Sequence, residues 1–172
     1  MNKLQIVKVT QDELYELQKI SKETFLETFE AVNSAENMKQ YLEESLSLKQ
    51  LTLELKNENS IFYFTKHEGE IIGYMKLNFG DAQTELKQEN ALEIERIYVL
   101  KQFHGKNIGQ LIFDKILEFA KQRHFDFIWL GVWEENPRAI RFYEKNEFVV
   151  FDKHIFKLGE DEQTDLMMKL MI

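Results

Sequence analysis

A strand, a glycine-containing loop and the start of a helix follow one another between residues 92 and 120. Residues 92–99 (LEIERIYV) are rich in β-branched and apolar side chains, which is typical of a buried strand. The loop at residues 104–109 (HGKNIG) leads into an amphipathic run whose apolar spacing predicts a helix. A loop at a helix N-terminus directs backbone N–H groups and the positive end of the helix dipole at an anion. This segment therefore predicts a phosphate-binding site.

Length and composition exclude several classes of protein. The 172 residues suit a single domain over residues 1–172. The absence of Cys excludes disulfides, cysteine-ligated zinc and thiol catalysis. The net charge of −8 disfavours nucleic-acid binding, since such proteins carry basic patches. An acidic surface attracts small cations, although solubility alone is the commoner reason for negative charge.

The sequence also disfavours membrane and metal sites. The first ten residues lack the apolar stretch of a signal peptide, and no window approaches a transmembrane span. We therefore expect a cytoplasmic protein without membrane contacts. The four histidines have no metal-ligand spacing, so no metal site is expected.

Periodicity and capping residues predict a mixed α/β (α+β) fold. Ser34 suits the N-cap of one helix, and Asn136 followed by Pro137 suits the start of another. Residues 47–57 predict a further turn or two of helix, and the polar residues 80–91 predict a surface loop. Strands are expected at residues 4–9, 60–66, 70–79, 92–99, 127–133, 148–156 and 166–171, and further helices at 11–29, 107–122 and 137–145. This order predicts a mostly antiparallel six- to seven-stranded sheet with helices on both faces.

A second motif indicates which phosphate-containing ligand the loop binds. Residues 136–148 (NPRAIRFYEKNEF) resemble the motif Asn-x-x-Ala-x-x-Phe-Tyr-x-x-x-Gly-Phe of the GNAT family of N-acetyltransferases, with Glu147 in place of the glycine. The loop at residues 104–109 resembles the family's phosphate loop, Arg/Gln-x-x-Gly-x-Gly/Ala, with His104 and Asn107 as departures. Asn tolerates positive φ, so the loop can keep its backbone shape. The resemblance covers residues 4–171 and implies a single GNAT-like domain, an acyltransferase and acetyl-CoA as cosubstrate.

The resemblance also implies how acetyl-CoA binds. The backbones of Ile97 and Val99, with Tyr98 between them, would pair with the pantetheine amides as an added strand does. Asn136 would contact the cofactor arm. The pyrophosphate would be held by the N–H groups of Gly105, Lys106, Asn107, Ile108, Gly109 and Gln110. The side chains of Lys106 and Arg138 are candidates for phosphate contacts, and the alternative is that they are simply solvated.

Amine acetylation needs a proton acceptor. A primary amine with a pKa of about 10.4 is mostly charged at pH 7, and neutralising it costs about 4–5 kcal/mol. Glu93 and Glu95 lie two residues apart on one strand, so their side chains face the same way. Glu93 matches the position of the base in some family members, and we slightly favour Glu95 as part of the amine site. The alternative for either residue is an ion pair with Arg96, Lys76 or another strand residue.

Tyr143 is the preferred catalytic acid. By resemblance it contacts the cofactor near the thioester sulfur, where it can protonate the departing thiolate. A phenol suits this step because it is neutral at pH 7 and can donate a hydrogen bond. The alternative is an aromatic side chain packed in the core.

The C-terminal segment suggests the acceptor. Residues 154–165 (HIFKLGEDEQTD) are similar to the tail of PaiA-like bacterial acetyltransferases, which acetylate polyamines such as spermidine. This similarity implies a small cationic amine, spermidine or spermine, as the substrate. The segment offers Glu160, Asp161, Glu162 and Asp165 as acidic groups near a cationic acceptor. The alternative, preferred for Glu160 and Glu162, is a solvated hairpin turn between the last two strands.

Two other functions stay open. One is an acetyltransferase for a protein N-terminus or another small amine. The other is a catalytically silent module that binds acetyl-CoA, which the presence of Tyr143 and both strand glutamates disfavours. In an active enzyme the absence of Cys favours direct transfer of the acetyl group. A homodimer is an alternative to a monomer, and exposed aromatic side chains would form its interface.

Overall fold

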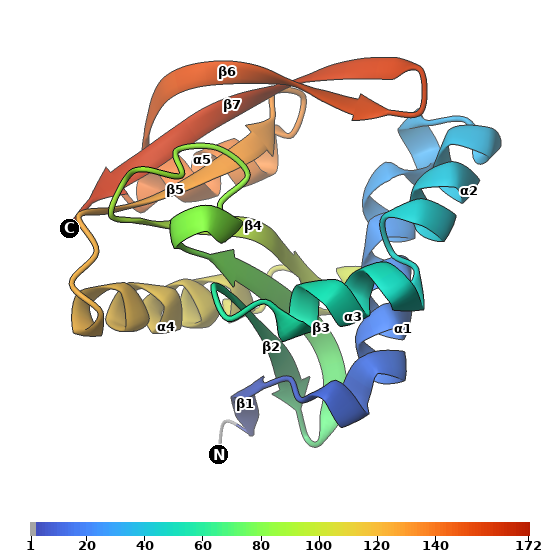
Figure 1. Cartoon of the computed structure of the whole chain (residues 1–172), viewed down its shortest axis with the longest axis horizontal. Helices are drawn as coiled ribbons and strands as arrows, with labels where there is room; N and C mark the ends of the chain where they lie inside the picture. The colour runs from blue at the N-terminus through green and yellow to red at the C-terminus, as the bar shows by residue number, and fades with distance from the viewer. Residues whose placement is uncertain (1–2) are drawn as a thin grey trace.

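A computed structural model describes residues 3–172, which form a seven-stranded sheet and five α-helices (Figure 1). The strands are β1 (Leu4–Lys8), β2 (Ser60–His67), β3 (Glu70–Asn78), β4 (Ala91–Val99), β5 (Phe127–Trp133), β6 (Val149–Leu158) and β7 (Asp161–Met171). The helices are α1 (Leu14–Phe29), α2 (Ala35–Glu44), α3 (Leu48–Lys56), α4 (Ile108–Gln122) and α5 (Pro137–Lys145). The expected mixed fold is confirmed.

The sheet separates in its middle. Its order is β1-β2-β3-β4-β5-β7-β6, and all neighbours are antiparallel except β4 and β5. The parallel register extends from Ala91↔Phe127 to Ile94↔Leu130, although both strands continue beyond it. The carboxyl-terminal halves of β4 and β5 therefore diverge. Such strand ends are where open α/β sheets bind ligands.

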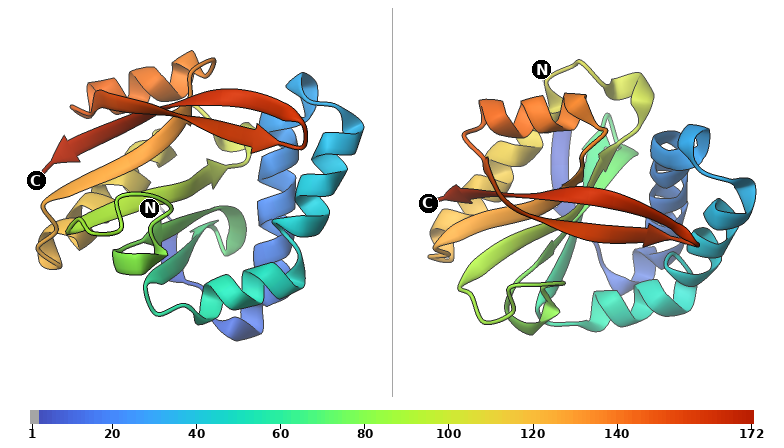
Figure 2. Two further views of the ribbon diagram at one scale, coloured as in Figure 1. Left: turned by 45° about the horizontal axis from the view of Figure 1, so that its top comes forward. Right: turned by 90° about the horizontal axis from the view of Figure 1, so that it is seen from above.

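Helices lie on both faces of the sheet (Figure 2), and a core of buried apolar side chains holds each set of helices against it. Helices α4 and α5 cover one face, where Ile112 and Ile116 of α4 pack with Leu92 and Ile94 of β4. Helices α1, α2 and α3 cover the other face, where their buried apolar side chains pack with β2 and β3. The divergent ends of β4 and β5 thus lie between two helical layers.

A β-bulge at Glu95 changes the alternation of β4. The β3–β4 register skips Glu95, so Glu95 and Arg96 together oppose Lys76. Both of these charged side chains lie on the α3 side, whereas Ile97 and Val99 pack in the core under α4. The bulge therefore separates a charged face of β4 from an apolar one.

Capping residues and other local sequence signals predicted the positions of most helices and strands correctly. Ser34 caps α2, since its hydroxyl oxygen accepts a hydrogen bond from the Asn37 N–H at 3.1 Å. Asn136 caps α5 by accepting from the Ala139 N–H at 3.2 Å, and Pro137 occupies the first helical position. The expected turn or two at residues 47–57 is a nine-residue helix, α3. No helix within residues 3–172 is long and apolar enough to cross a membrane.

The C-terminal segment corrects one expectation. The final strands were expected to end at residue 156 and to resume at residue 166, but β6 extends to Leu158 and β7 begins at Asp161. The turn is therefore only Gly159 and Glu160, with φ of 63° at Gly159. Pairing with β6 holds the polar residues 161–165 in the sheet despite their low strand propensity. The hairpin reaches across to α2, where the Asn37 side-chain amide donates to the Asp161 carboxylate at 3.0 Å (Figure 1).

Candidate active site

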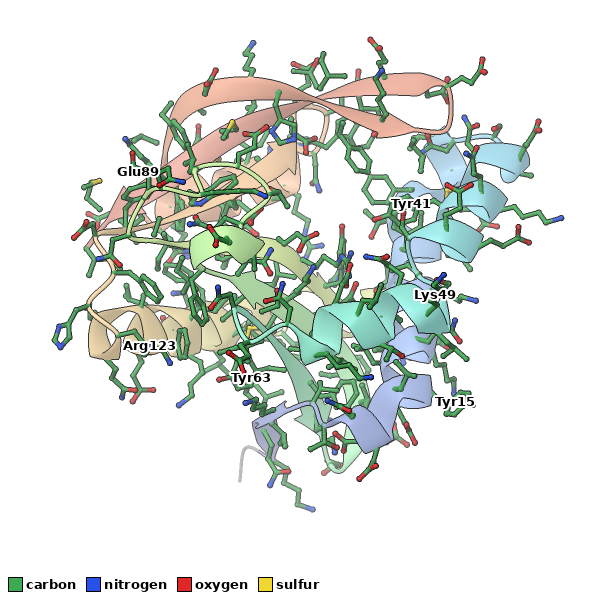
Figure 3. All side chains as sticks on the ribbon, in the orientation of Figure 1. Tyr15, Tyr41, Lys49, Tyr63, Glu89 and Arg123 are labelled. Carbon is green, nitrogen blue, oxygen red and sulfur yellow. The ribbon has the colours of Figure 1, made fainter. Side chains whose placement is uncertain are left out.

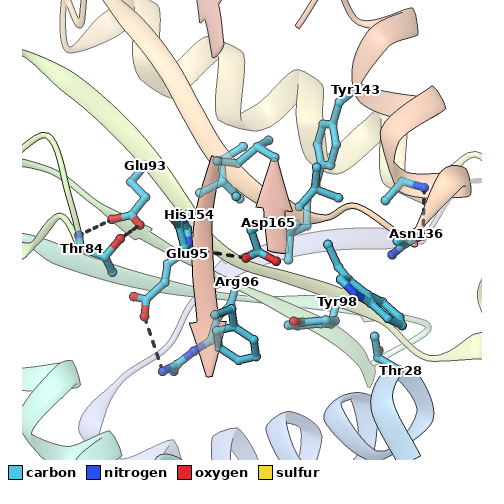
Figure 4. A pocket seen from close by; sticks show the side chains of 18 of the residues that line it. Thr28, Thr84, Glu93, Glu95, Arg96, Tyr98, Asn136, Tyr143, His154 and Asp165 are labelled. Carbon is cyan, nitrogen blue, oxygen red and sulfur yellow. Dashed lines mark hydrogen bonds and ion pairs between the residues drawn. The ribbon is translucent and has the colours of Figure 1, made fainter. Parts of the chain in front are cut away.

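Two cavities meet where β4 and β5 diverge. The loop cavity lies beside residues 104–110 and the start of α5 and is lined, among others, by Val99, His104, Gly105, Asn107 and Arg138. The acidic cavity lies on the α1–α3 side and is lined, among others, by Glu93, Glu95, Arg96, His154 and Asp165 (Figure 4). Seven residues line both cavities and form what we call the shared wall: Thr28, Ile97, Tyr98, Trp133, Asn136, Ala139 and Tyr143. Ligands in the two cavities would therefore approach each other at this wall.

The loop at residues 104–110 presents free backbone donors. Gly105 and Asn107 have φ of 76° and 61°, so Asn107 adopts the left-handed conformation that the family's glycine would take. The first hydrogen bond of α4 runs from the Leu111 N–H to the Asn107 carbonyl. Among the described residues, the N–H groups of residues 105–110 have no hydrogen-bond acceptor. This row of donors at a helix start has the chemistry that a pyrophosphate needs.

His104, a departure from the family's phosphate loop, contacts the cationic side chain of Arg138. His104 Nε2 lies 2.7 Å from the Val99 carbonyl oxygen, which can only accept, so Nε2 carries the hydrogen. Nδ1 then accepts a hydrogen bond from Arg138 Nη1 at 2.6 Å. The Arg138 guanidinium is thereby held at the loop cavity. The ammonium of Lys106 instead lies 5.1 Å from the centroid of the Phe103 ring. Lys106 is not among the described residues that line this cavity.

The free backbone edge of β4 faces the loop cavity. The Leu100 N–H donates to the Ile72 carbonyl of β3 at 2.8 Å. Backbone groups alternate in direction along an antiparallel strand, so Tyr98 also faces β3, whereas Ile97 and Val99 face the divergence. The His104 contact with the Val99 carbonyl agrees with this assignment. The backbones of the two residues proposed to pair with pantetheine thus point away from β3, and the Val99 carbonyl is already engaged by His104.

Tyr143 lies in the shared wall and in the core at once. Its side chain is buried and packs against Phe142 and Phe148, with ring centroids 5.3 and 5.4 Å away. Burial raises the pKa of its hydroxyl well above the ordinary value for tyrosine. The hydroxyl therefore stays protonated and able to donate at neutral pH. The catalytic and packing interpretations of Tyr143 are compatible.

Glu95 belongs to a buried ion-pair network. Its carboxylate pairs with Lys76 and lies 3.7 Å from Arg96, which also makes a two-pronged contact with Glu54 of α3 at 2.8 and 3.1 Å. Burial alone would raise the pKa of Glu95, but Arg96 and Lys76 outweigh burial and lower it. The ion-pair alternative is therefore confirmed for Glu95, and its lowered pKa makes it a weak proton acceptor.

Glu93 is more buried and has different partners. Its carboxylate accepts hydrogen bonds from the backbone N–H and hydroxyl of Thr84 and, at 3.1 Å, from the Asn78 amide. The same Asn78 amide donates to Glu95 at 2.7 Å, so the two glutamates share a face as predicted. Burial raises the pKa of Glu93, although the hydrogen bonds from Thr84 and Asn78 oppose this rise.

A His–Asp pair that the sequence did not indicate lies in the acidic cavity (Figure 4). His154 of β6 and Asp165 of β7 are cross-strand partners, with Nε2 3.6 Å from the Asp165 carboxylate. His154 Nδ1 lies 3.8 Å from the Glu85 carboxylate. Both side chains lie over Gly131, where an added Cβ would be 3.2 Å from His154 and 3.3 Å from Asp165. Burial raises the pKa of Asp165, and His154 opposes this rise.

Aromatic rings form the rest of the acidic cavity. The Tyr41 ring of α2, labelled in Figure 3, stacks on Phe25 of α1 with centroids 4.1 Å apart. Phe29, Trp133 and Phe156 continue this wall, with neighbouring centroids 6.2 to 6.5 Å apart. The rings come from both helices and strands, and the long β6–β7 hairpin carries Phe156 across to them.

Only one of the acidic residues in the C-terminal segment faces this cavity. Asp165 lines it, whereas Asp161 contacts Asn37 on α2. Glu160 is exposed in the turn, and Glu162 is exposed and lies 3.7 Å from Lys157. The solvated alternative preferred for Glu160 and Glu162 agrees with their exposure.

Known proteins agree with this architecture. Residues 14–148 match the acetyltransferase (GNAT) family. The chain is 41% identical, over 98% of both chains, to an uncharacterized N-acetyltransferase in the pepI 3' region of Lactobacillus delbrueckii subsp. lactis. Its fold is similar to that of the PaiA N-acetyltransferase from Thermoplasma acidophilum in complex with coenzyme A (TM-score 0.80, 22% identity, 98% and 99% of the two chains covered). It is also similar to a spermidine N-acetyltransferase SpeG chimera from Vibrio cholerae and hSSAT (TM-score 0.69, 16% identity, 98% and 95% covered).

The family match and the full-length relative complete the evidence from the two motifs, the divergent strands and the free donors of the loop. The chain belongs to the acetyltransferase (GNAT) family and is an acyltransferase with acetyl-CoA as its cosubstrate.

Proposed function

We propose that this acetyltransferase transfers the acetyl group directly to a primary amine of a small polycation, with spermidine and spermine as the expected class. The observation that carries the proposal is the combination of carboxylates and aromatic faces in the acidic cavity. An acceptor with several ammonium groups on a flexible aliphatic chain is complementary to both.

The charge balance of the cavity favours a cation. Lys76 and Arg96 neutralise Glu54 and Glu95. Glu93 and Asp165, however, have no Lys or Arg within ion-pair distance among the described residues. An ammonium about 4 Å from a carboxylate gains on the order of 4 kcal/mol at an effective dielectric constant of about 20. A polyamine would supply the cations that this cavity lacks.

The aromatic wall supports the same class of ligand. Cations within about 6 Å of an aromatic ring face are attracted by its quadrupole, by about 0.5–2 kcal/mol. Methylene segments between ammonium groups would pack on the same rings. The stacked Tyr41 and Phe25 rings, with Phe156 beside them, would therefore bind the chain of the polyamine.

We assign the loop cavity to the cosubstrate. Acetyl-CoA, when bound, supplies an acetyl group activated as a thioester. The N–H groups of residues 105–110 and the Arg138 guanidinium would hold its phosphates, and Asn136 would contact its arm. The backbones of Ile97 and Val99 would pair with its amides. The acetyl end would then lie at the shared wall, beside the acidic cavity.

Tyr143 would be the general acid in this arrangement. Its hydroxyl is protonated at neutral pH and can give a proton to the departing sulfur. Glu93, which has no Lys or Arg partner among the described residues, would bind and orient the ammonium group through its charge. The charge of Glu95 is already balanced by Lys76 and Arg96, so Glu95 would only shape the cavity around the ammonium. The hydrogen bonds of Glu93 suit this binding role better than proton uptake.

The comparisons support the fold and not the identity of the acceptor. Solved structures named as a PaiA and as a spermidine N-acetyltransferase share the fold, but at 22% and 16% identity they support the fold alone. The proposal therefore depends on the residues of the cavity.

A thiol-release assay with acetyl-CoA and a panel of amines tests the proposal. The panel comprises spermidine, spermine, butylamine as a single-charge control, and short peptides with free N-termini. We expect kcat/KM to be highest for spermidine or spermine and to fall as salt screens the charges. Turnover of peptides or of butylamine at equal rates would contradict the polyamine assignment. Tight binding of acetyl-CoA without turnover of any amine would indicate a silent binding module.

A further inference from the structure

We propose that His154 is the proton acceptor for the amine, with Glu85 orienting its ring and Asp165 holding the ammonium beside it. This inference rests on the proposed amine acetylation, but not on the identity of the amine. It assigns roles to three residues that neither motif of the family contains.

The geometry distinguishes the two ring nitrogens. His154 Nδ1 is buried and has no hydrogen-bond partner among the described residues, and it lies 3.8 Å from the Glu85 carboxylate. A ligand in the acidic cavity therefore reaches the ring at Nε2, which lies 3.6 Å from Asp165. A hydrogen on Nδ1 would point to Glu85 and leave Nε2 as an acceptor. Such contacts are often long before a substrate binds.

The position of the pair fits the reaction. His154 and Asp165 line the same cavity as Tyr143, which lies in the shared wall. Gly131 of β5 leaves the space that the two side chains occupy, because a Cβ there would be within 3.3 Å of both. The charged or titratable groups around His154 are Glu85 and Asp165 at ion-pair distance and, from β4 across the cavity, Glu93, Glu95 and Arg96.

Imidazole is better suited to this step than the carboxylates of the cavity. The ordinary pKa of a histidine lies closer to that of an ammonium than the ordinary pKa of a carboxyl does. Glu95 is further weakened as a base by its ion pairs with Lys76 and Arg96. The flanking carboxylates Glu85 and Asp165 would stabilise the imidazolium that forms.

The residues of the site, together with solvent, account for every proton in the reaction. The substrate ammonium gives one proton to His154 Nε2, and the freed lone pair of the nitrogen forms the C–N bond with the acetyl carbon. The C–S bond breaks, and the leaving sulfur takes a proton from Tyr143. The second nitrogen proton is lost as the amide forms and restores the Tyr143 hydroxyl through solvent. His154 then releases its proton to solvent.

The test compares His154→Gln with wild type at saturating acetyl-CoA between pH 6 and pH 9, using the best amine of the panel. We expect kcat/KM for the amine to fall by about 100-fold or more, as for loss of a general base. The decline of the wild-type rate at low pH should also disappear. Acetyl-CoA affinity, measured by calorimetry, should be unchanged. His124→Asn, at an exposed histidine with a left-handed backbone, is the matched control and should behave as wild type.

Three further measurements separate proton transfer from a structural role. Added imidazole should restore activity to His154→Ala in proportion to its concentration. The loss in His154→Gln should shrink for a weakly basic amine that is already neutral at the assay pH. Glu85→Gln should move the low-pH decline to lower pH, because it removes a negative charge beside the ring. A His154→Gln variant with the wild-type rate and pH profile would overturn the proposal, as would an equal loss with the weakly basic amine.

Failure of the two proposals can be distinguished. If wild type acetylates only monoamines or peptides, the polyamine proposal fails and the His154 test is made with that substrate. If wild type acetylates no amine, both proposals fail.

Discussion

Lys76→Met should destabilise the protein strongly, because it removes one cation from a buried network. The Lys76 side chain is 7% exposed, and its ammonium pairs with Glu95 and lies 3.4 Å from Glu54. With Arg96, the network holds two cations and two carboxylates. Met fills a similar volume to the aliphatic part of Lys, so the main effect is one uncompensated buried negative charge.

The size of the effect follows from burial. Breaking a buried ion pair by removing one partner costs about 3–5 kcal/mol, and the partial exposure of Glu95 favours the lower end. An unfolding entropy of about 2.1 cal/mol/K per residue gives about 0.36 kcal/mol/K for 172 residues. A loss of about 3 kcal/mol therefore lowers Tm by about 8 °C.

Thermal unfolding followed by circular dichroism at pH 7.5 measures this shift. The double variant Lys76→Met/Glu95→Gln removes one charge of each sign, so it should recover part of the lost stability. Lys39→Met is the control, because Lys39 is 73% exposed and its contact with Glu43 at 3.9 Å is a surface pair. Equal Tm values for Lys76→Met and Lys39→Met, or a double variant less stable than Lys76→Met, would refute the reasoning.

Four further predictions concern the site and the termini of its helices. Tyr143→Phe should lower kcat about 100-fold or more with little change in KM for acetyl-CoA, and an unchanged kcat would remove Tyr143 from the mechanism. His104→Ala should weaken acetyl-CoA binding roughly tenfold in calorimetry, because Arg138 loses its partner in the loop. Burial raises the pKa of Asp165, so its contribution to stability is present at low pH and is lost as the pH rises through the folded-state pKa. Asp165→Asn should therefore raise Tm at pH 7 but not below the ordinary Asp pKa of about 3.9. Glu147 has φ of 69°, and Glu147→Gly should stabilise the protein by about 1 kcal/mol in urea unfolding.

The elements around the loop cavity were predictable because their signals are local. The cap at Asn136, the proline after it and the left-handed Asn107 each act within a few residues of their own position. Periodicity then gives the strand and helix that flank the loop. The motif positions could therefore be located without knowing how the strands pair.

The acidic cavity was less predictable because it depends on pairing between distant segments. His154 and Asp165 meet through the β6–β7 register, and Glu85 comes from a polar loop expected only to cover the surface. Glu54 reaches Arg96 from a helix that the sequence indicated only as a turn or two. Asp165 and His154 had a sequence signal only as members of the tail segment at residues 154–165, and Arg96 only as a possible ion-pair partner of the strand glutamates, whereas Glu54 and Glu85 had none.

The bulge at Glu95 explains why one strand can serve both cavities. With strict alternation, Arg96 would point to the apolar core under α4, and the side chains of Ile97 and Val99 would trade faces with Tyr98. The extra residue opposite Lys76 lets two charged side chains share the acidic face while the phase beyond it keeps Ile97 and Val99 in the core. This feature belongs to the β3–β4 register and not to β4 alone. The pattern of residues 92–99 alone therefore predicts neither the shared acidic face of Glu95 and Arg96 nor the return of Ile97 and Val99 to the core.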